Sequence, residues 1–162
     1  MQFDALSPAD LQFHVQRLLA EYAHCIDDDR LEAWPYFFAE TCVYKIVARE
    51  NVARGLPLAA IFCDNRRMLI DRIVSLRHAN VYETHHYRHV IGATLVTNVT
   101  PASVDARSSY AVFRTRTNGQ TDVYSAGVYE DVITAAADGL KFRQKYVIYD
   151  TSRIDTLLVT PL

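Results

Sequence analysis

The sequence predicts an α+β domain in which early helices pack on one face of a curved, mainly antiparallel sheet. Two observations carry this prediction. Apolar residues recur at helical spacing before about residue 78, whereas from residue 89 onward they alternate with polar residues, as they do in strands. Short turn signals separate the strand-like runs, which is typical of an antiparallel meander. Helices grouped before strands in this way indicate an α+β arrangement.

Composition limits the classes of protein to consider. With 162 residues and 50% hydrophobic content, we expect a single domain, 1–162. The net charge of −2 provides no basic field, so we expect neither nucleic acid nor a membrane as a partner. The three cysteines lack CxxC spacing and suit reduced, buried thiols. Because no signal peptide or membrane-length apolar run is present, we expect a cytoplasmic protein.

Helices are expected in the first half of the chain. Ser7 and Pro8 form an N-terminal capping signal, and one apolar stripe then continues to about Asp27. A short second helix, capped by Asp29, would place Trp34 inward. Residues 42–47 alternate as a strand does, and residues 51–58 indicate a loop. A longer helix is expected after Asp64, which is a suitable N-cap.

Strands are expected in the second half, in four runs at roughly 89–99, 104–117, 122–134 and 140–150. Asn118-Gly119 and Asp138-Gly139 supply the turn residues that hairpins prefer. The third run is apolar on both faces. One face is expected to carry Val123, Tyr129 and Ile133, and the opposite face Tyr124, Val128 and Val132. Since the helices can cover only one face, we expect the other to support self-association.

Ordered blocks of residues carry a resemblance to a known family. The first half contributes Asp28-Asp29-Arg30 with Trp34 and Phe37-Phe38, then Asp64 to Leu69 with Asp71-Arg72, then Arg88-His89. The second half contributes FRTR at 113–116, AGVYED at 126–131 and VIYD at 147–150. From about Tyr22 to the C-terminus, the chain resembles the small (β) subunits of Rieske-type aromatic-ring-hydroxylating dioxygenases. The order of elements also resembles the cystatin-like and NTF2-like cone folds.

The resemblance implies a non-catalytic structural subunit. Its partner would be a large (α) subunit that holds a Rieske [2Fe-2S] cluster, a mononuclear iron and the substrate pocket. The expected assembly is an α3β3 hexamer with a trimer of small subunits, supplied with electrons from NAD(P)H through a separate reductase or ferredoxin. Within the family, residues 49–58, 82–89 and 155–158 look most like the subunits that act with benzoate-type acids, such as salicylate, anthranilate or terephthalate.

The histidine-rich segment 82–89 raises the question of a metal site. Glu83, His85 and His89 would share one side of an extended segment, but the two histidines would then lie about 13 Å apart, too far for one metal ion. The Cys and His pairs that a Rieske cluster needs are also missing from the chain. We therefore expect no metal or cofactor in this chain, and the resemblance implies that it carries no catalytic residue.

For segment 82–89 we favour a structural role or a role in subunit contacts over a catalytic role. Arg88 offers a planar fork for a carboxylate, and His89 can bond a carbonyl or an acid, either within the chain or on a partner. The candidate subunit-interface residues are Tyr87, Arg88, His89, Tyr124, Val128 and Val132.

Two other classes of function stay open. A stand-alone isomerase or dehydratase would need a base and tyrosines inside the cone, and the candidates are His24, Asp28, Tyr44, Tyr129 and Tyr146. Asp28 lies in an acidic run at a helix end, where capping and solvation are the usual roles. A stand-alone ligand-binding or adaptor protein of the same fold is the third class.

Overall fold

A six-stranded curved sheet organises the computed structural model, which describes residues 2–79, 84–150, 158 and 160–162. The strands lie in the order β2-β1-β6-β5-β4-β3. Their bounds are β1 Phe38–Ala48, β2 Ile61–Cys63, β3 His85–Val99, β4 Ser103–Arg116, β5 Thr121–Ala136 and β6 Gly139–Tyr149. The helices are η1 Phe3–Ala5, α1 Pro8–Asp27, η2 Trp34–Phe37, α2 Arg49–Ala53 and α3 Arg66–His78. The predicted α+β class is confirmed.

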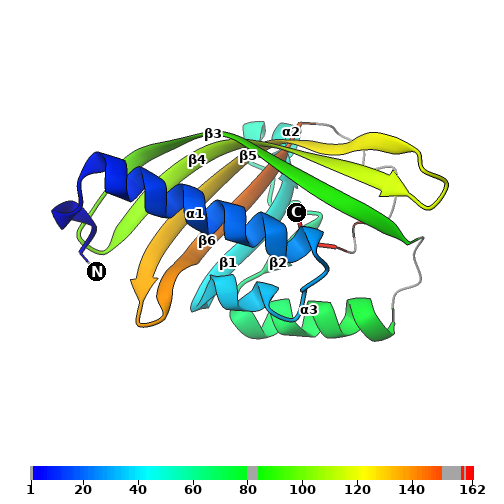
Figure 1. Ribbon diagram of the computed structural model, residues 1–162, viewed down its shortest axis with the longest axis horizontal. Coiled ribbons are helices and arrows are strands. Elements are labelled where there is room, and N and C mark those ends of the chain that lie inside the picture. The colour runs from blue at the N-terminus through cyan, green and yellow to red at the C-terminus, as the bar shows by residue number, and fades with distance from the viewer. Residues whose placement is uncertain (1, 80–83, 151–157, 159) are drawn as a thin grey trace.

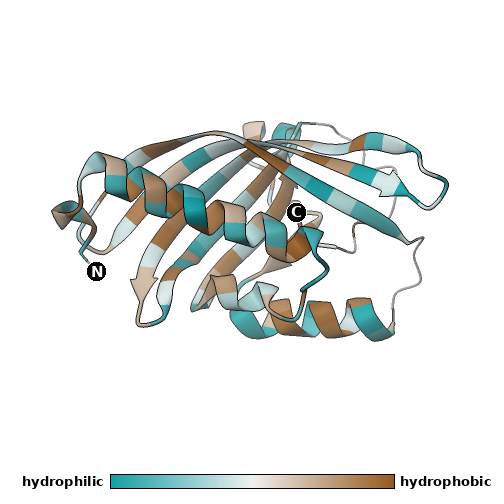
Figure 2. Ribbon diagram, in the orientation of Figure 1, coloured by the Kyte–Doolittle hydropathy of each residue, from teal (hydrophilic) through white to brown (hydrophobic). Residues whose placement is uncertain are grey.

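The antiparallel meander β3–β6 forms as predicted, and β1 adds to it in parallel beside β6. Gly127 helps to hold this register, because a Cβ there would overlap the carbonyl oxygen of Ile148 on β6. Hydrophobic and hydrophilic residues alternate along the central strands (Figure 2). The period of two sends each strand's apolar set toward one face.

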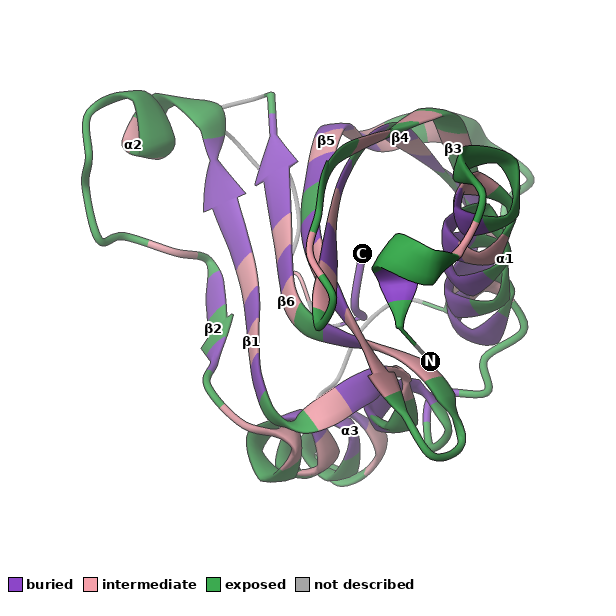
Figure 3. Cartoon of the chain, turned by 90° about the vertical axis from the view of Figure 1, so that its left-hand side faces the viewer, coloured by how far each residue is buried: buried purple, intermediate pink, exposed green. Residues whose placement is uncertain are grey.

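Both long helices lie on the same face of the sheet, which we call the inner face. α1 runs across the sheet, and α3 packs beside β1 (Figure 1). The sheet curls around this side, so that the buried residues gather inside the curve (Figure 3). Edge-to-face contacts among Tyr22, Trp34, Phe38 and Tyr44 fill its centre.

The long helices begin at two different kinds of cap. The Ser7 hydroxyl accepts a hydrogen bond from the backbone N–H of Asp10, as its position predicts. At α3 the prediction of Asp64 was wrong by one residue. Asn65 is the cap, and its Oδ1 accepts from the N–H of Met68 at 3.0 Å. Asp64 lies one position too early to reach that group, and it accepts instead from the side chain of Asn65.

The prediction of a second helix capped by Asp29 was also wrong. Asp29 has a left-handed φ of 56°, and the helix that follows is one 3-10 turn beginning at Trp34. Asp29 and Glu32 both accept hydrogen bonds from Arg77 at the end of α3, so they join two helical segments instead of capping one. The expected loop 51–58 contains the end of the short helix α2, and the three-residue strand β2 was not predicted.

Candidate functional site

The candidate interface residues of β3 lie at an edge of the sheet, because β4 is the one neighbour of β3 among the described strands. Tyr87 and His89 face inward and are buried, whereas the side chain of Arg88 is 63% exposed. This alternation follows from the period of the strand. Of the three, only Arg88 presents its side chain to the outside of the subunit.

His89 is bound by the last residue of α1. Its ring Nδ1 lies 2.6 Å from Oδ1 of Asp27, and its backbone N–H donates to Oδ2 at 2.9 Å. Both side chains are almost fully buried. The guanidinium of Arg88 lies 3.8 Å from the same carboxylate. Asp27 therefore ties the end of α1 to the edge strand through three contacts, and the interaction of His89 is internal to the chain.

Sequence reasoning selected Asp28 and missed Asp27. Asp28 is exposed and pairs loosely with Arg30 at 3.4 Å. A signal for Asp27 was present, since it follows Ala23 by four residues and Leu19 by eight, both on the buried side of α1. The apolar stripe of a helix thus predicts which residue of an acidic run turns inward.

Tyr124 does not share a face with Val128 and Val132, and the predicted alternation was wrong there. The ladder between β4 and β5 shifts register between Val112 and Phe113, leaving Tyr124 as an extra residue on β5. Such a bulge reverses the side on which the following residues project. Tyr124 consequently stacks on Tyr87, with ring centroids 5.2 Å apart, and lies under the guanidinium of Arg114.

Arg114 completes this inward-facing cluster. Its side chain is almost fully buried, and Nη2 donates to Asp122 at 2.9 Å. The hydrogen bond from Arg114 lowers the pKa of the Asp122 carboxyl below its ordinary value. Tyr87, Tyr124 and Arg114 thus hold the ends of β3, β4 and β5 together.

The opposite face of the sheet, the outer face, carries an apolar patch. Val128 and Val132 lie there half-buried. Val90, Phe113 and Val123 are exposed on the same face, with Phe113 paired to Val123 across the ladder. We define the outer patch by its members: Val90, Ala111, Phe113, Val123, Ala126 and Val128. Contiguous exposed apolar residues of this kind typically mark an interaction surface.

The candidates for a pocket inside the cone do not converge. Tyr44 and Tyr129 are buried in the interior, His24 and Asp28 are exposed, and Tyr146 lies on the outer face beside Lys45. Tyr44 donates to the backbone oxygen of Leu162, and Leu162 is itself buried. This separation provides no base positioned beside a tyrosine in the manner that an isomerase or dehydratase needs.

A buried ion pair that sequence reasoning missed occupies the interior. Nζ of Lys145 lies 3.2 Å from Oδ1 of Asp131, with both side chains fully buried. The same ammonium lies 3.6 Å from the ring centroid of Tyr129 and 4.7 Å from that of Tyr22. Burial raises the pKa of Asp131 to about 6, against the opposing effect of Lys145, and burial lowers the pKa of Lys145. Both groups belong to the buried core.

The segment around His85 does not assemble a metal site in the part of the chain that the structure describes. No group of three or more His, Cys, Asp or Glu side chains comes close enough there to hold an ion. His85 packs against the ring of Tyr87, and His89 is engaged by Asp27. Glu83, the remaining candidate ligand, lies outside the described residues.

Among the residues that the structure describes, no helix is long and apolar enough to cross a membrane.

Comparisons with known proteins identify the class to which this fold and surface belong. The family described as ring hydroxylating beta subunit matches residues 21–156. The anthranilate 1,2-dioxygenase small subunit of Burkholderia cepacia is 47% identical over 150 residues, covering 93% of each chain. A β subunit of terephthalate 1,2-dioxygenase from a Comamonas species is 35% identical, covering 88% of this chain and 93% of that protein.

A solved structure agrees in detail. The β subunit of an aromatic-ring-hydroxylating dioxygenase from Novosphingobium aromaticivorans superposes with a TM-score of 0.87 at 44% identity, covering 95% of this chain and 98% of that one. The matches thus define the class as small subunits of aromatic-ring-hydroxylating dioxygenases. The chain belongs to the ring-hydroxylating dioxygenase β-subunit family.

Proposed function

We propose that the chain is the non-catalytic structural subunit of an oxygenase that adds oxygen to an aromatic carboxylate. The observation that carries the choice of substrate class is the 47% identity to the anthranilate 1,2-dioxygenase small subunit along nearly the whole of both chains. The terephthalate relative supports the same class, because its substrate is also an aromatic acid. The scattered positions of His24, Asp28 and Tyr146 favour a scaffold over a catalytic role.

The proposed partner is a large (α) subunit that holds the Rieske [2Fe-2S] cluster and the mononuclear iron. We infer an α3β3 hexamer in the cytoplasm, reduced by NAD(P)H through a separate reductase or ferredoxin. This chain contributes no ligand to either iron centre in the proposal. The family membership supports the partner, and the absence of Cys-x-His spacing in the sequence supports placing the cluster elsewhere.

Within that assembly, Arg88, Val128 and Val132 are the proposed contact residues. Arg88 is exposed at the sheet edge, Val128 belongs to the outer patch, and Val132 lies on the same face, so all three can meet another chain. The interface proposal also includes Tyr87, His89 and Tyr124. These residues face inward, so they would contribute indirectly, by packing against one another and fixing the shape of the β3 edge. We also propose that the outer patch packs against another copy of this chain in a trimer.

Turnover by the reconstituted holoenzyme tests the non-catalytic assignment. His85→Ala, His86→Ala and Asp28→Asn are expected to keep turnover within about tenfold, because a general acid or base contributes about 10²- to 10⁴-fold. Each variant is scored only if both subunits still elute together. A loss beyond about a hundredfold in an intact assembly would place catalysis in this chain.

A further inference from the structure

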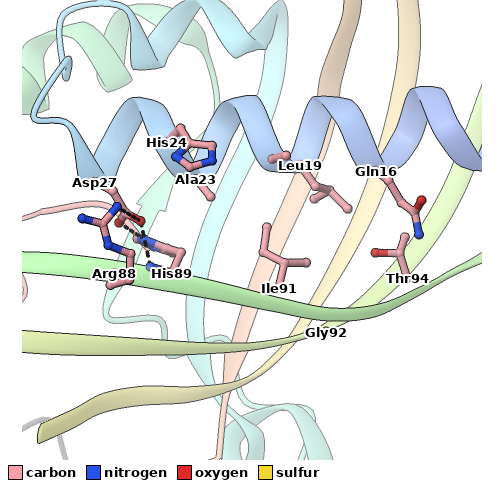
Figure 4. A pocket seen from close by; sticks show the side chains of 11 residues that line it. Gln16, Leu19, Ala23, His24, Asp27, Arg88, His89, Ile91, Gly92 and Thr94 are labelled. Atoms are coloured by element: carbon pink, nitrogen blue, oxygen red, sulfur yellow. Dashed lines mark hydrogen bonds and ion pairs between the residues drawn. The ribbon is translucent and has the colours of Figure 1, made fainter.

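A cavity separates the second half of α1 from β3, and the family assignment does not account for it. Its volume is about 300 Å³. Figure 4 shows Asp27, Arg88 and His89 at one end, Leu19 and Ile91 further along, and Gln16 and Thr94 at the far end. The middle of the cavity is thus apolar and one end is charged. We call it the α1–β3 cavity.

The charged end contains an unsatisfied donor or acceptor. His89 lines the cavity, its Nδ1 is engaged by Asp27, and its Nε2 is buried with no hydrogen-bond partner among the described residues. Leaving such a group unpaired costs about 1–3 kcal/mol. A polar atom of a bound molecule at this end of the cavity would remove that cost.

The charges at this end suit an anion. The carboxylate of Asp27 is already matched by the ring and backbone N–H groups of His89 and by Arg88 at 3.8 Å. A second carboxylate at this end could accept hydrogen bonds from an Nε2–H of His89 and from the guanidinium of Arg88. Hydrogen bonds in which the donor or the acceptor is charged are about twice as strong as neutral ones.

The size of the cavity restricts the rest of the ligand. A cavity of about 150 Å³ holds benzene, so one of 300 Å³ has room for a single ring with one substituent. Leu19, Ala23 and Ile91 provide the apolar contact for such a ring. We propose that the α1–β3 cavity binds a ring-sized monocarboxylate, with its ring between α1 and β3 and its carboxylate at His89 Nε2 and Arg88. The proposal does not depend on the oxygenase function.

Benzoate is the probe for a calorimetric titration of the full-length chain at pH 7. We expect saturable binding with a Kd of about 1 mM or lower, together with a change in the ¹⁵N resonance of His89 Nε2. Benzamide keeps the ring without the charge, and acetate keeps the charge without the ring. Both should bind at least about tenfold more weakly, since each retains only half of the recognition.

Three variants link binding to the cavity. Arg88→Gln removes the exposed cation, and Ala23→Leu fills the apolar middle; each should weaken benzoate binding by about tenfold or more. Arg17→Gln, on the same helix but outside the cavity, is the matched control and should bind as the parent does. Ala20→Leu replaces Ala23→Leu if the latter does not fold, because Ala20 lines the cavity from an exposed position.

Two results would overturn the proposal. One is the lack of saturable benzoate binding, which would mean that His89 Nε2 is satisfied by water alone. The other is benzoate binding that Arg88→Gln and both cavity-filling variants leave unchanged, which would place the ligand elsewhere.

Discussion

Lys145 and Asp131 form an ion pair whose side chains are both fully buried. Removing a carboxylate and an ammonium from water is costly, and the ion pair with the surrounding aromatic rings offsets that cost only while both partners are present. Their positions on neighbouring strands, opposite each other in the β5–β6 ladder, make the pairing possible. The sequence did not predict this pair, because strand pairing rather than the period of either strand brings the two residues together.

Breaking this pair should be more harmful than removing it. Lys145→Met leaves a buried, unpaired carboxylate and is expected to lower the free energy of unfolding by about 3–5 kcal/mol. The double variant Asp131→Leu/Lys145→Met should recover about 2 kcal/mol or more of that loss. Urea unfolding of the three proteins gives these values. A double variant that is less stable than the single one would show that the pair stabilises the core as a unit.

The raised pKa of Asp131 predicts a pH dependence of stability. The folded state holds the proton up to about pH 6, whereas the unfolded chain releases it near pH 4. Between these values the folded state binds more protons, so the contribution of Asp131 to the free energy of unfolding falls as pH rises. The unfolding free energy of the parent minus that of the double variant should therefore decrease from about pH 4 to pH 6. A difference that increases over this window would contradict the assignment.

At the scale of elements, long periodic segments were predictable and short ones were not. α1 ends at Asp27 as its stripe predicts, and the four late strands lie close to their predicted ranges. The short elements α2 and β2 have too few residues to show a period, so only tertiary contacts define them. The bulge at Tyr124 could not be predicted either. One extra residue in a strand changes the face on which the neighbouring side chains lie, but it leaves no mark in the composition.

The cap of α3 provides a test at this scale. Asn65→Ala removes the acceptor for the N–H of Met68 and should lower the free energy of unfolding by about 0.5–2 kcal/mol. Asp64→Ala is the matched neighbour, and its effect should stay below about 0.5 kcal/mol. Thermal or urea unfolding measures both. A larger loss in Asp64→Ala than in Asn65→Ala would reverse the assignment of the cap.

For the whole molecule, the sheet explains why this subunit should associate. Its inner face is covered by α1 and α3, while the outer face keeps Val90, Phe113 and Val123 exposed. The apolar character of both faces was evident from the sequence. The partition of residues between them was not, because the face of Tyr124 depends on a bulge. The Asp27–His89 pair likewise required the fold, since 62 residues separate its members.

The outer patch predicts a self-associated state. Val123→Asp and Val128→Asp each place a charge in a buried apolar contact and should convert the oligomer to monomers while the fold persists. Light scattering at micromolar concentration reports the mass, and circular dichroism reports the fold. Leu95→Asp, also exposed but outside the patch, is the control and should leave the mass unchanged. A parent protein that is a stable monomer would refute self-association through this face.

Native mass spectrometry of the chain co-expressed with a large oxygenase subunit from its own host tests whether this chain is a structural subunit. We expect one complex with equal numbers of both subunits, in which all of the iron stays with the large subunit after the two are separated. Turnover of an aromatic acid should require both chains. A small subunit that never joins the complex, or that retains stoichiometric iron when separated, would contradict its role as a structural subunit.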